Sequence, residues 1–163
     1  VAAGTGTDFQ FFPPGKTITA IDISPGMLER ARNRAEAYRG SLTLRVMDVQ
    51  ALEFPEATFD TIVTSCTFCS VPDPLRGLRE LYRCLKPGGQ ILMFEHVRSR
   101  VGPIALMQDV MTLITSRIGP DMNRETVSNV VRAGFELYRE QNVYLDVVKS
   151  IEARRPLHGN SSS

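Results

Sequence analysis

The sequence predicts an α/β fold, a mostly parallel sheet of seven strands with one antiparallel strand and with helices on both faces. Apolar, β-branched runs alternate with helical patterns, and the connections between them are short, which is typical of parallel strands joined by helices. Two strand-like runs with a tight connection close the chain, and they predict an antiparallel pair at the end of the sheet.

Six runs of apolar and β-branched residues have the length of strands. They are residues 17–22, 42–47, 59–65, 90–97, 135–142 and 145–151. The chain opens at Val1 with what resembles the end of a strand and the loop after it. We therefore expect a further, central strand ahead of Val1, and we interpret the chain as a fragment without its natural N-terminus.

Helices are expected where apolar residues recur at helical spacing. Ser24 and Asp73 each precede a proline, and this pair of residues is typical of an N-cap and the first helical position. Gly40 ends the first of these helices, and the turn at residues 86–89 ends the second. The other expected helices cover residues 8–12, 104–118 and 124–133.

Composition and length describe an ordinary globular protein. The 163 residues suffice for one domain, which we place at residues 1–152, with a disordered tail over 153–163. The net charge of +1 and the scattered arginines argue against nucleic acid as a partner. Three cysteines disfavour a disulfide framework and suit a reducing, cytoplasmic location, while membrane attachment through residues ahead of Val1 stays open, as does the oligomeric state.

A glycine-rich turn and two carboxylates suggest a cofactor site. Gly4 and Gly6 follow the opening strand-like residues, and a turn without Cβ atoms lets a ligand approach the backbone. The helix expected next would point free N–H groups at that ligand. Asp22 ends the strand over 17–22, where a carboxylate can accept hydrogen bonds from ribose hydroxyls. Asp48 follows the next strand and suits an acceptor for an adenine amino group.

The order of these signals, followed by Thr64 and Ser65 at a strand end and by the turn Leu-Lys-Pro-Gly-Gly, resembles class I S-adenosylmethionine-dependent methyltransferases. The likeness is to the small-molecule subgroup, which includes quinone-biosynthesis, phospholipid and alkyl-thiol methyltransferases. It implies a Rossmann-like fold, S-adenosylmethionine as cofactor and a small, apolar acceptor. The cofactor-binding residues that it implies are Ala3, Gly4, Gly6, Asp22, Ile23, Met27, Asp48, Val49, Thr64, Ser65 and Cys66. The family's usual first glycine is replaced by Ala2, which is tolerable if its backbone angles are ordinary.

The methyl group of a sulfonium is already reactive, so placing the acceptor in line behind it supplies most of the catalysis. His96, at the end of the strand over 90–97, is the candidate general base, and a role in shaping the pocket is the alternative. Glu95 beside it could orient His96 or face the opposite side of the sheet.

Cys66 and Cys69 have the spacing of a redox or zinc pair. The chain has no second pair, and Cys84 falls in an expected helix, so we expect no metal and interpret both residues as small pocket walls.

Two other functions share part of the pattern. A nicotinamide-dependent dehydrogenase would use the same loop and acidic residue, but Tyr144 and Lys149 lack the Tyr-x-x-x-Lys spacing. A non-catalytic cofactor-binding module is the third alternative, because methyl transfer needs no diagnostic side chain.

Overall fold

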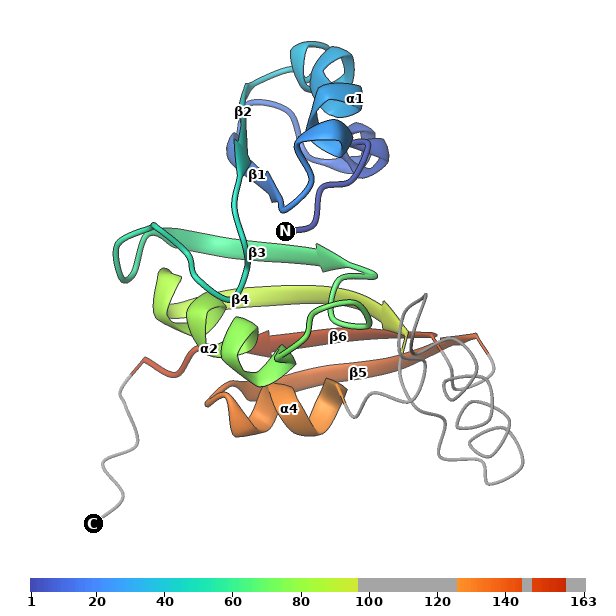
Figure 1. Ribbon diagram of the computed structural model, residues 1–163. Helices are drawn as coiled ribbons and strands as arrows, with labels where there is room; N and C mark the ends of the chain where they lie inside the picture. Colours follow the sequence, from blue (N-terminus) through green and yellow to red (C-terminus); the bar gives the residue numbers. More distant parts are fainter. Residues whose placement is uncertain (97–125, 145–147, 158–163) are drawn as a thin grey trace.

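The strands form two sheets. A computed structural model describes residues 1–96, 126–144 and 148–157, and everything below concerns these residues. β1 (Thr17–Asp22) and β2 (Ser41–Val46) form a two-stranded parallel sheet. β3 (Phe59–Ser65), β4 (Leu85–His96), β6 (Val148–Arg154) and β5 (Glu136–Tyr144) form a four-stranded sheet in that order (Figure 1).

The prediction of one continuous seven-stranded sheet is therefore wrong for the described residues, which form two separate sheets with six strands in total. Residues 1–3 lie between the two sheets: the Val1 nitrogen donates to the carbonyl of Val63 on β3 at 2.7 Å, and Ala3 N donates to Ile21 O on β1 at 2.9 Å. These bonds hold the two sheets together at one end, but so short a segment does not pair as a strand. The single reversed strand is confirmed, because β6 is antiparallel to both β4 and β5, whereas β3 and β4 are parallel.

The helices begin at the expected caps. α1 (Pro25–Glu36) has Ser24 as its N-cap, whose hydroxyl accepts from Met27 N at 3.3 Å. α2 (Pro74–Cys84) has Asp73 as its N-cap, whose carboxylate accepts from Arg76 N at 3.0 Å. Both caps satisfy an N–H of the first turn that has no partner within the helix.

The segment at the start of the chain differs from its expected helix. Thr7–Phe11 forms η1, a five-residue 3₁₀ helix that begins after Gly6 and has no side-chain N-cap. So short a helix does not supply the aligned N–H groups of an α-helix N-terminus to a ligand.

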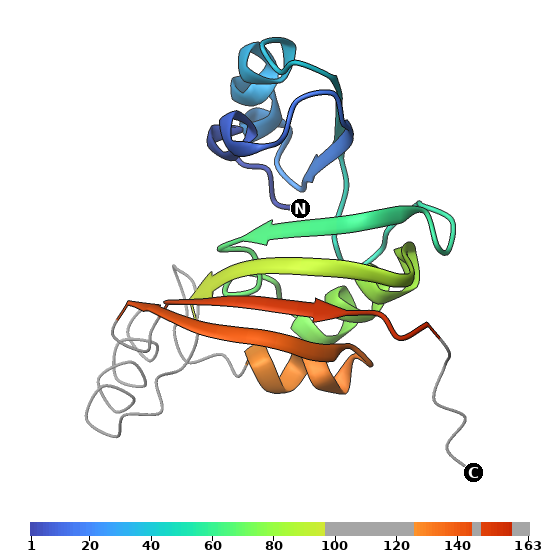
Figure 2. The same ribbon diagram turned by 180° about the vertical axis from the view of Figure 1, so that it is seen from behind.

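The described helices over the four-stranded sheet lie on one face only. α2 and α4 (Thr126–Arg132) lie together on that face, as the opposed views in Figures 1 and 2 show. The main core fills the space between them and the strands, with Leu78, Leu81, Ile91, Val130 and Ile151 fully buried. The helix expected over residues 104–118 lies outside the described part of the chain.

Arg155, which follows β6, forms hydrogen bonds to the C-terminal end of α2. Its guanidinium donates to the carbonyl oxygens of Tyr82, Arg83 and Leu85 at 2.8–3.2 Å and to the carboxylate of Glu56 at 2.8 Å. These bonds satisfy carbonyl groups at the helix C-terminus, where a positive charge is also favourable. The packed structure thus continues beyond residue 152. No helix among the described residues is long and apolar enough to span a membrane.

Candidate cofactor site

The predicted site residues gather at one edge of the molecule, where β1, β2 and β3 end. β1 and β2 pair in parallel, so their carboxyl ends lie at the same edge of their sheet, and the bonds of residues 1–4 bring this edge close to β3 of the other sheet. The glycine loop, residues 2–6, reaches this edge and contacts β1 through Ala3 and Asp22. The β3–α2 loop, residues 66–73, reaches it too, because Thr67 Oγ1 lies 3.4 Å from Val1 O.

Asp22 joins the glycine loop to the start of α1. One carboxylate oxygen accepts from Gly4 N at 2.8 Å, and the other accepts from Ser24 N at 2.9 Å. The side chain is half-buried. A carboxylate has about four acceptor positions, so Asp22 retains the capacity to accept further hydrogen bonds on its exposed side. It holds the loop rather than capping α1, since Ser24 is the cap.

The two glycines of the loop have different surroundings. Gly4 has a φ of +53°, and a Cβ added to it would meet nothing within 4 Å, so its backbone borders open space. Gly6 has a φ of +75°, and a Cβ there would lie 2.6 Å from the ring of Phe9. Gly4 therefore leaves room for a ligand, whereas Gly6 allows the loop to pack against η1.

Ala2 departs from the sequence expectation. Its φ is +52°, in the left-handed region that favours glycine, so its backbone angles are not the ordinary ones that the sequence analysis required. Ala2 therefore carries backbone strain at the position where the resemblance implies a glycine.

Asp48 is held by the residue two positions after it. Gln50 donates its backbone N–H to Asp48 Oδ1 at 2.8 Å, and its amide nitrogen lies 3.2 and 3.1 Å from the two carboxylate oxygens. The Gln50 amide oxygen in turn accepts from Asp73 N at 2.9 Å, and its carbonyl accepts from Arg76 Nε at 2.9 Å. Gln50 thus connects the end of β2 to the start of α2.

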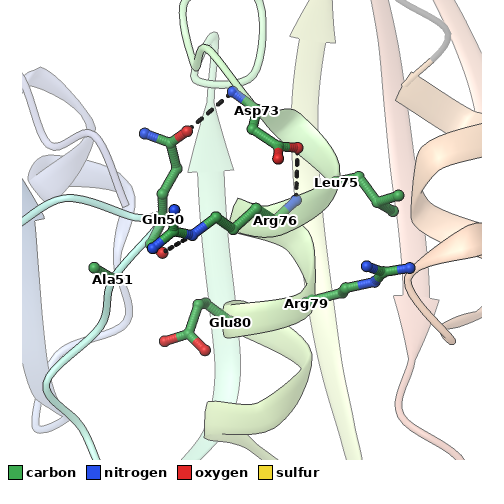
Figure 3. A pocket seen from close by; sticks show the side chains of 7 residues that line it. All are labelled: Gln50, Ala51, Asp73, Leu75, Arg76, Arg79 and Glu80. Carbon is green, nitrogen blue, oxygen red and sulfur yellow. Dashed lines mark hydrogen bonds between the residues drawn. The ribbon is translucent and has the colours of Figure 1, made fainter.

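A pocket of about 460 Å³ lies beside this connection, between the Gln50 turn and the exposed side of α2. Figure 3 shows Arg76 reaching across from α2 to the Gln50 turn, while Arg79 points away from it. The pocket wall is therefore formed by side chains that already hold the two elements together.

The β3–α2 loop is held from β4. Cys66 N donates to Phe94 O at 2.8 Å, and Glu95 accepts from Thr67 N and Phe68 N, both at 3.1 Å. Glu95 also accepts from the hydroxyl of Thr64 at 2.8 Å. Thr64 is buried, so its side chain supports the site from within, while Ser65 and Cys66 lie closer to the surface.

Cys66 and Cys69 both lie in the β3–α2 loop. Cys66 is exposed and Cys69 is buried, and neither forms a disulfide bond in the described part of the chain. Partial burial of each thiol, together with the nearby Glu95 carboxylate, raises the pKa of both groups. Within the described ranges, no cluster of His, Cys, Asp and Glu could hold a metal ion.

His96 ends β4, as predicted, opposite Val148 on β6. Its side chain lies outside the described residues, so its role as a base stays a prediction.

The residues present suit an adenosine-containing cofactor. Asp22 offers free acceptor capacity, Gly4 borders open space, and Ile23 and Met27 are 67% and 41% exposed beside them. Exposed apolar side chains next to a carboxylate provide a surface for a flat base and an acceptor for hydroxyl groups. Met27 is on the exposed side of α1, whereas Leu28 and Ala31 form the buried side of that helix.

The sequence analysis did not predict that Gln50 and Glu95 hold neighbouring segments of the site in place. Gln50 has no signal of its own in the sequence, because its role depends on a partner in α2. Glu95 does have one: it follows Ile91 and Met93 at alternate positions, so it falls on the buried face of β4. A charged residue at a buried strand position indicates a specific partner.

The chain matches the family model described as "Methyltransferase domain" over residues 1–93. It is 32% identical over 121 residues to a phosphatidylethanolamine N-methyltransferase from Cereibacter sphaeroides, covering 73% of this chain and 60% of that protein. It is also 32% identical over 143 residues to a thiol S-methyltransferase from Rattus norvegicus, covering 83% of this chain and 58% of that protein. The chain thus spans about three fifths of the length of these relatives.

The fold is shared with solved structures. A SAM-dependent methyltransferase from Methanosarcina mazei aligns with a TM-score of 0.74 at 20% identity, covering 96% of this chain and 91% of that one. At this identity the comparison supports the α/β methyltransferase fold and nothing finer.

Proposed function

Because the chain belongs to the methyltransferase family, whose cofactor is S-adenosylmethionine, we propose that it binds this cofactor at the edge where β1, β2 and β3 end. We propose further that it transfers the methyl group to a small, apolar acceptor.

The contact between Asp22 and the glycine loop carries this proposal. Two segments far apart in the sequence meet there, and the carboxylate that joins them keeps acceptor capacity toward open space. A ribose that donates two hydroxyl groups suits this carboxylate. The amino-acid end of the cofactor would then lie along the glycine loop, near Gly4.

The other predicted residues are assigned by their positions along the same edge. Asp48 and the backbone of Val49 suit the adenine amino group and ring, with Ile23 and Met27 against the ring face. Ser65 and Cys66, at the end of β3, would border the sulfonium end.

The chain's contribution to the reaction is binding and orientation. When bound, the cofactor supplies an electrophilic methyl group. Holding an acceptor in line with it accounts for about 7–11 kcal/mol of the barrier in favourable cases. A base is needed only for an acceptor that arrives protonated, and His96 at the end of β4 is the candidate.

The acceptor class follows from relatives that differ in the atom they methylate. One is named for an amine of a phospholipid and another for a thiol. Both acceptors combine a nucleophilic atom with apolar groups, and neither is a nucleic acid. We therefore propose an apolar amine, thiol or quinol as the acceptor of this chain.

A nicotinamide-dependent dehydrogenase is not favoured. Lys149, the lysine nearest to the required motif, is 4% exposed and forms an ion pair with Glu140 at 2.6 Å. A catalytic lysine of that class would need to reach the substrate.

Calorimetric titration of the full natural chain with S-adenosylhomocysteine and, separately, with NAD tests the proposal. Micromolar binding of S-adenosylhomocysteine alone is expected. Binding of NAD alone would overturn the proposal, and silence toward both would leave a non-catalytic module. Turnover in a screen of thiols, quinols and aminolipids then distinguishes an enzyme from a module that only binds the cofactor.

A further inference from the structure

Glu95 is a carboxylate in the protein core. It lies on β4, on the same face as the buried Ile91 and Met93, and its exposure is 0%. Acidic side chains are almost never fully buried unless they have specific partners. Burial raises the pKa of Glu95, and its hydrogen bonds act in the opposite direction. So unfavourable a position for a carboxylate calls for a reason beyond packing.

The partners of Glu95 all belong to one segment. The hydroxyl of Thr64 and the backbone N–H of Thr67 donate to Oε1, at 2.8 and 3.1 Å, and the N–H of Phe68 donates to Oε2 at 3.1 Å. Lys149 lies directly across from Glu95 on β6, but its ammonium pairs with Glu140. Glu95 therefore binds the β3–α2 loop and not a cation of the sheet.

This loop needs such support because its backbone is strained where it leaves β3. Cys66 has a φ of +49°, a conformation that residues with a side chain rarely adopt. Thr67 and Phe68, the next two residues, are the ones that donate to Glu95. The carboxylate of Glu95 fixes the two backbone N–H groups after Cys66, and this prevents the backbone of Cys66 from relaxing to an ordinary extended conformation.

The β3–α2 loop also contacts Val1, which directly precedes the glycine loop. Thr67 Oγ1 lies 3.4 Å from Val1 O, and the Val1 nitrogen bonds to Val63 on β3. Thr67 therefore connects the β3–α2 loop to the segment that bonds to both β1 and β3.

We propose that Glu95 is a positioning residue, which fixes the β3–α2 loop so that Ser65 and Cys66 form the wall of the cofactor site beside the glycine loop. This inference rests on the proposed function, since it assigns the loop to the cofactor. It gives Glu95 no contact with the cofactor and no part in proton transfer.

Glu95→Gln tests the proposal in the full natural chain. Glutamine has nearly the same volume, but its NH₂ group cannot accept a backbone N–H. At least one of the two loop bonds is then lost. We expect the Kd for S-adenosylhomocysteine to rise roughly tenfold, the effect of losing about one hydrogen bond to a charged group.

Glu56→Gln is the control. Glu56 accepts from the guanidinium of Arg155 at 2.8 Å, and it lies before the start of β3, at the opposite end of that strand from Ser65 and Cys66. Glu56→Gln should leave the Kd within about twofold of the native value, whereas its effect on the resistance to urea reports only the lost surface contact.

The outcomes separate the two proposals. If the native chain does not bind S-adenosylhomocysteine, the proposed function fails. If the native chain and Glu95→Gln bind it equally, only the role of Glu95 is overturned. If Glu95→Gln does not fold, Thr64→Val takes its place, because it removes a single donor to Glu95 at a side chain that is 1% exposed. A weakened affinity in that variant supports the proposal, and an unchanged affinity overturns it.

Discussion

Asp22→Ala is expected to weaken the binding of S-adenosylhomocysteine roughly 10- to 100-fold. A hydrogen bond to a charged group contributes about 1.5–3 kcal/mol, and each 1.4 kcal/mol is about tenfold in Kd. Two of the carboxylate's acceptor positions are used by Gly4 N and Ser24 N, at 2.8 and 2.9 Å, so the ligand can gain only from the remaining ones. The magnitude therefore corresponds to about one strong bond and not to four.

The substitution also removes the link between the glycine loop and β1. The N–H groups of Gly4 and Ser24 lose their acceptor, which lowers the free energy of unfolding by about 1 kcal/mol for each bond. Asp22→Asn separates the two effects in part, because its amide oxygen can still accept one N–H. Its loss of affinity should fall between that of the native chain and that of Asp22→Ala.

Isothermal titration calorimetry measures the affinity, and urea denaturation of the same samples measures the stability. Asp60→Ala is the control for a lost carboxylate, since Asp60 lies at the start of β3 and pairs on the surface with Lys86 at 2.7 Å. A Kd for Asp22→Ala within about twofold of the native value, in a variant that is folded, would remove Asp22 from the cofactor site.

Three other predictions concern stability and reactivity. Gly6→Ala should lower the free energy of unfolding by more than about 2 kcal/mol, because the added Cβ would lie 2.6 Å from an aromatic carbon of Phe9 and the φ of +75° disfavours a side chain. Gly4→Ala should lower it by about 1 kcal/mol, because no atom obstructs its Cβ, and should also weaken cofactor binding. Equal losses of stability in the two variants would contradict this. Arg155→Ala should lower the free energy of unfolding, measured by urea denaturation, by about 2–4 kcal/mol, because the carbonyl groups at the end of α2 lose their donor. Arg154→Ala loses only an exposed cation–π contact and should lower it by less than about 1 kcal/mol. The raised pKa of Cys66 leaves less thiolate at neutral pH, so iodoacetamide should modify this residue more slowly than an ordinary thiol, at a rate that rises with pH. Mass spectrometry measures the modified product. S-adenosylhomocysteine should slow the modification further, because Cys66 is proposed to border the cofactor site.

Sequence reasoning succeeded where the interacting groups are close along the chain. Ser24 bonds to Met27 N, and Asp73 bonds to Arg76 N, both within one helical turn, so the residue type and the following proline suffice to predict each cap. Within each sheet, the common edge of the parallel carboxyl ends was also predictable, because parallel pairing of β1 with β2 and of β3 with β4 produces it regardless of side-chain detail. The number of strands was not, because it depends on how residues 1–3 pair with β1 and β3.

Loop conformation was harder to predict, because the decisive residues are not glycines. Ala2 and Cys66 have φ values of +52° and +49°, and neither residue type signals a left-handed backbone. The carboxylates that hold these loops act over long separations: Asp22 is 18 residues from Gly4, and Glu95 is 28 residues from Thr67. Nothing local to either pair identifies its partner.

Asp22 and Glu95 thus do the same structural task with different consequences for a ligand. Each accepts two backbone N–H groups: Asp22 accepts one from the glycine loop and one from the start of α1, and Glu95 accepts both from the β3–α2 loop. Asp22 is half-buried and keeps acceptor positions toward open space, so the same residue type also fits a known ribose-binding pattern and could be predicted. Glu95 is fully buried and directs its acceptors into the protein, so no ligand motif includes it. Asp22→Ala should therefore reduce the affinity because a hydrogen bond to the ligand is lost. Glu95→Gln should reduce it because Ser65 and Cys66, which form the wall of the site, are displaced, although Glu95 itself does not reach the ligand.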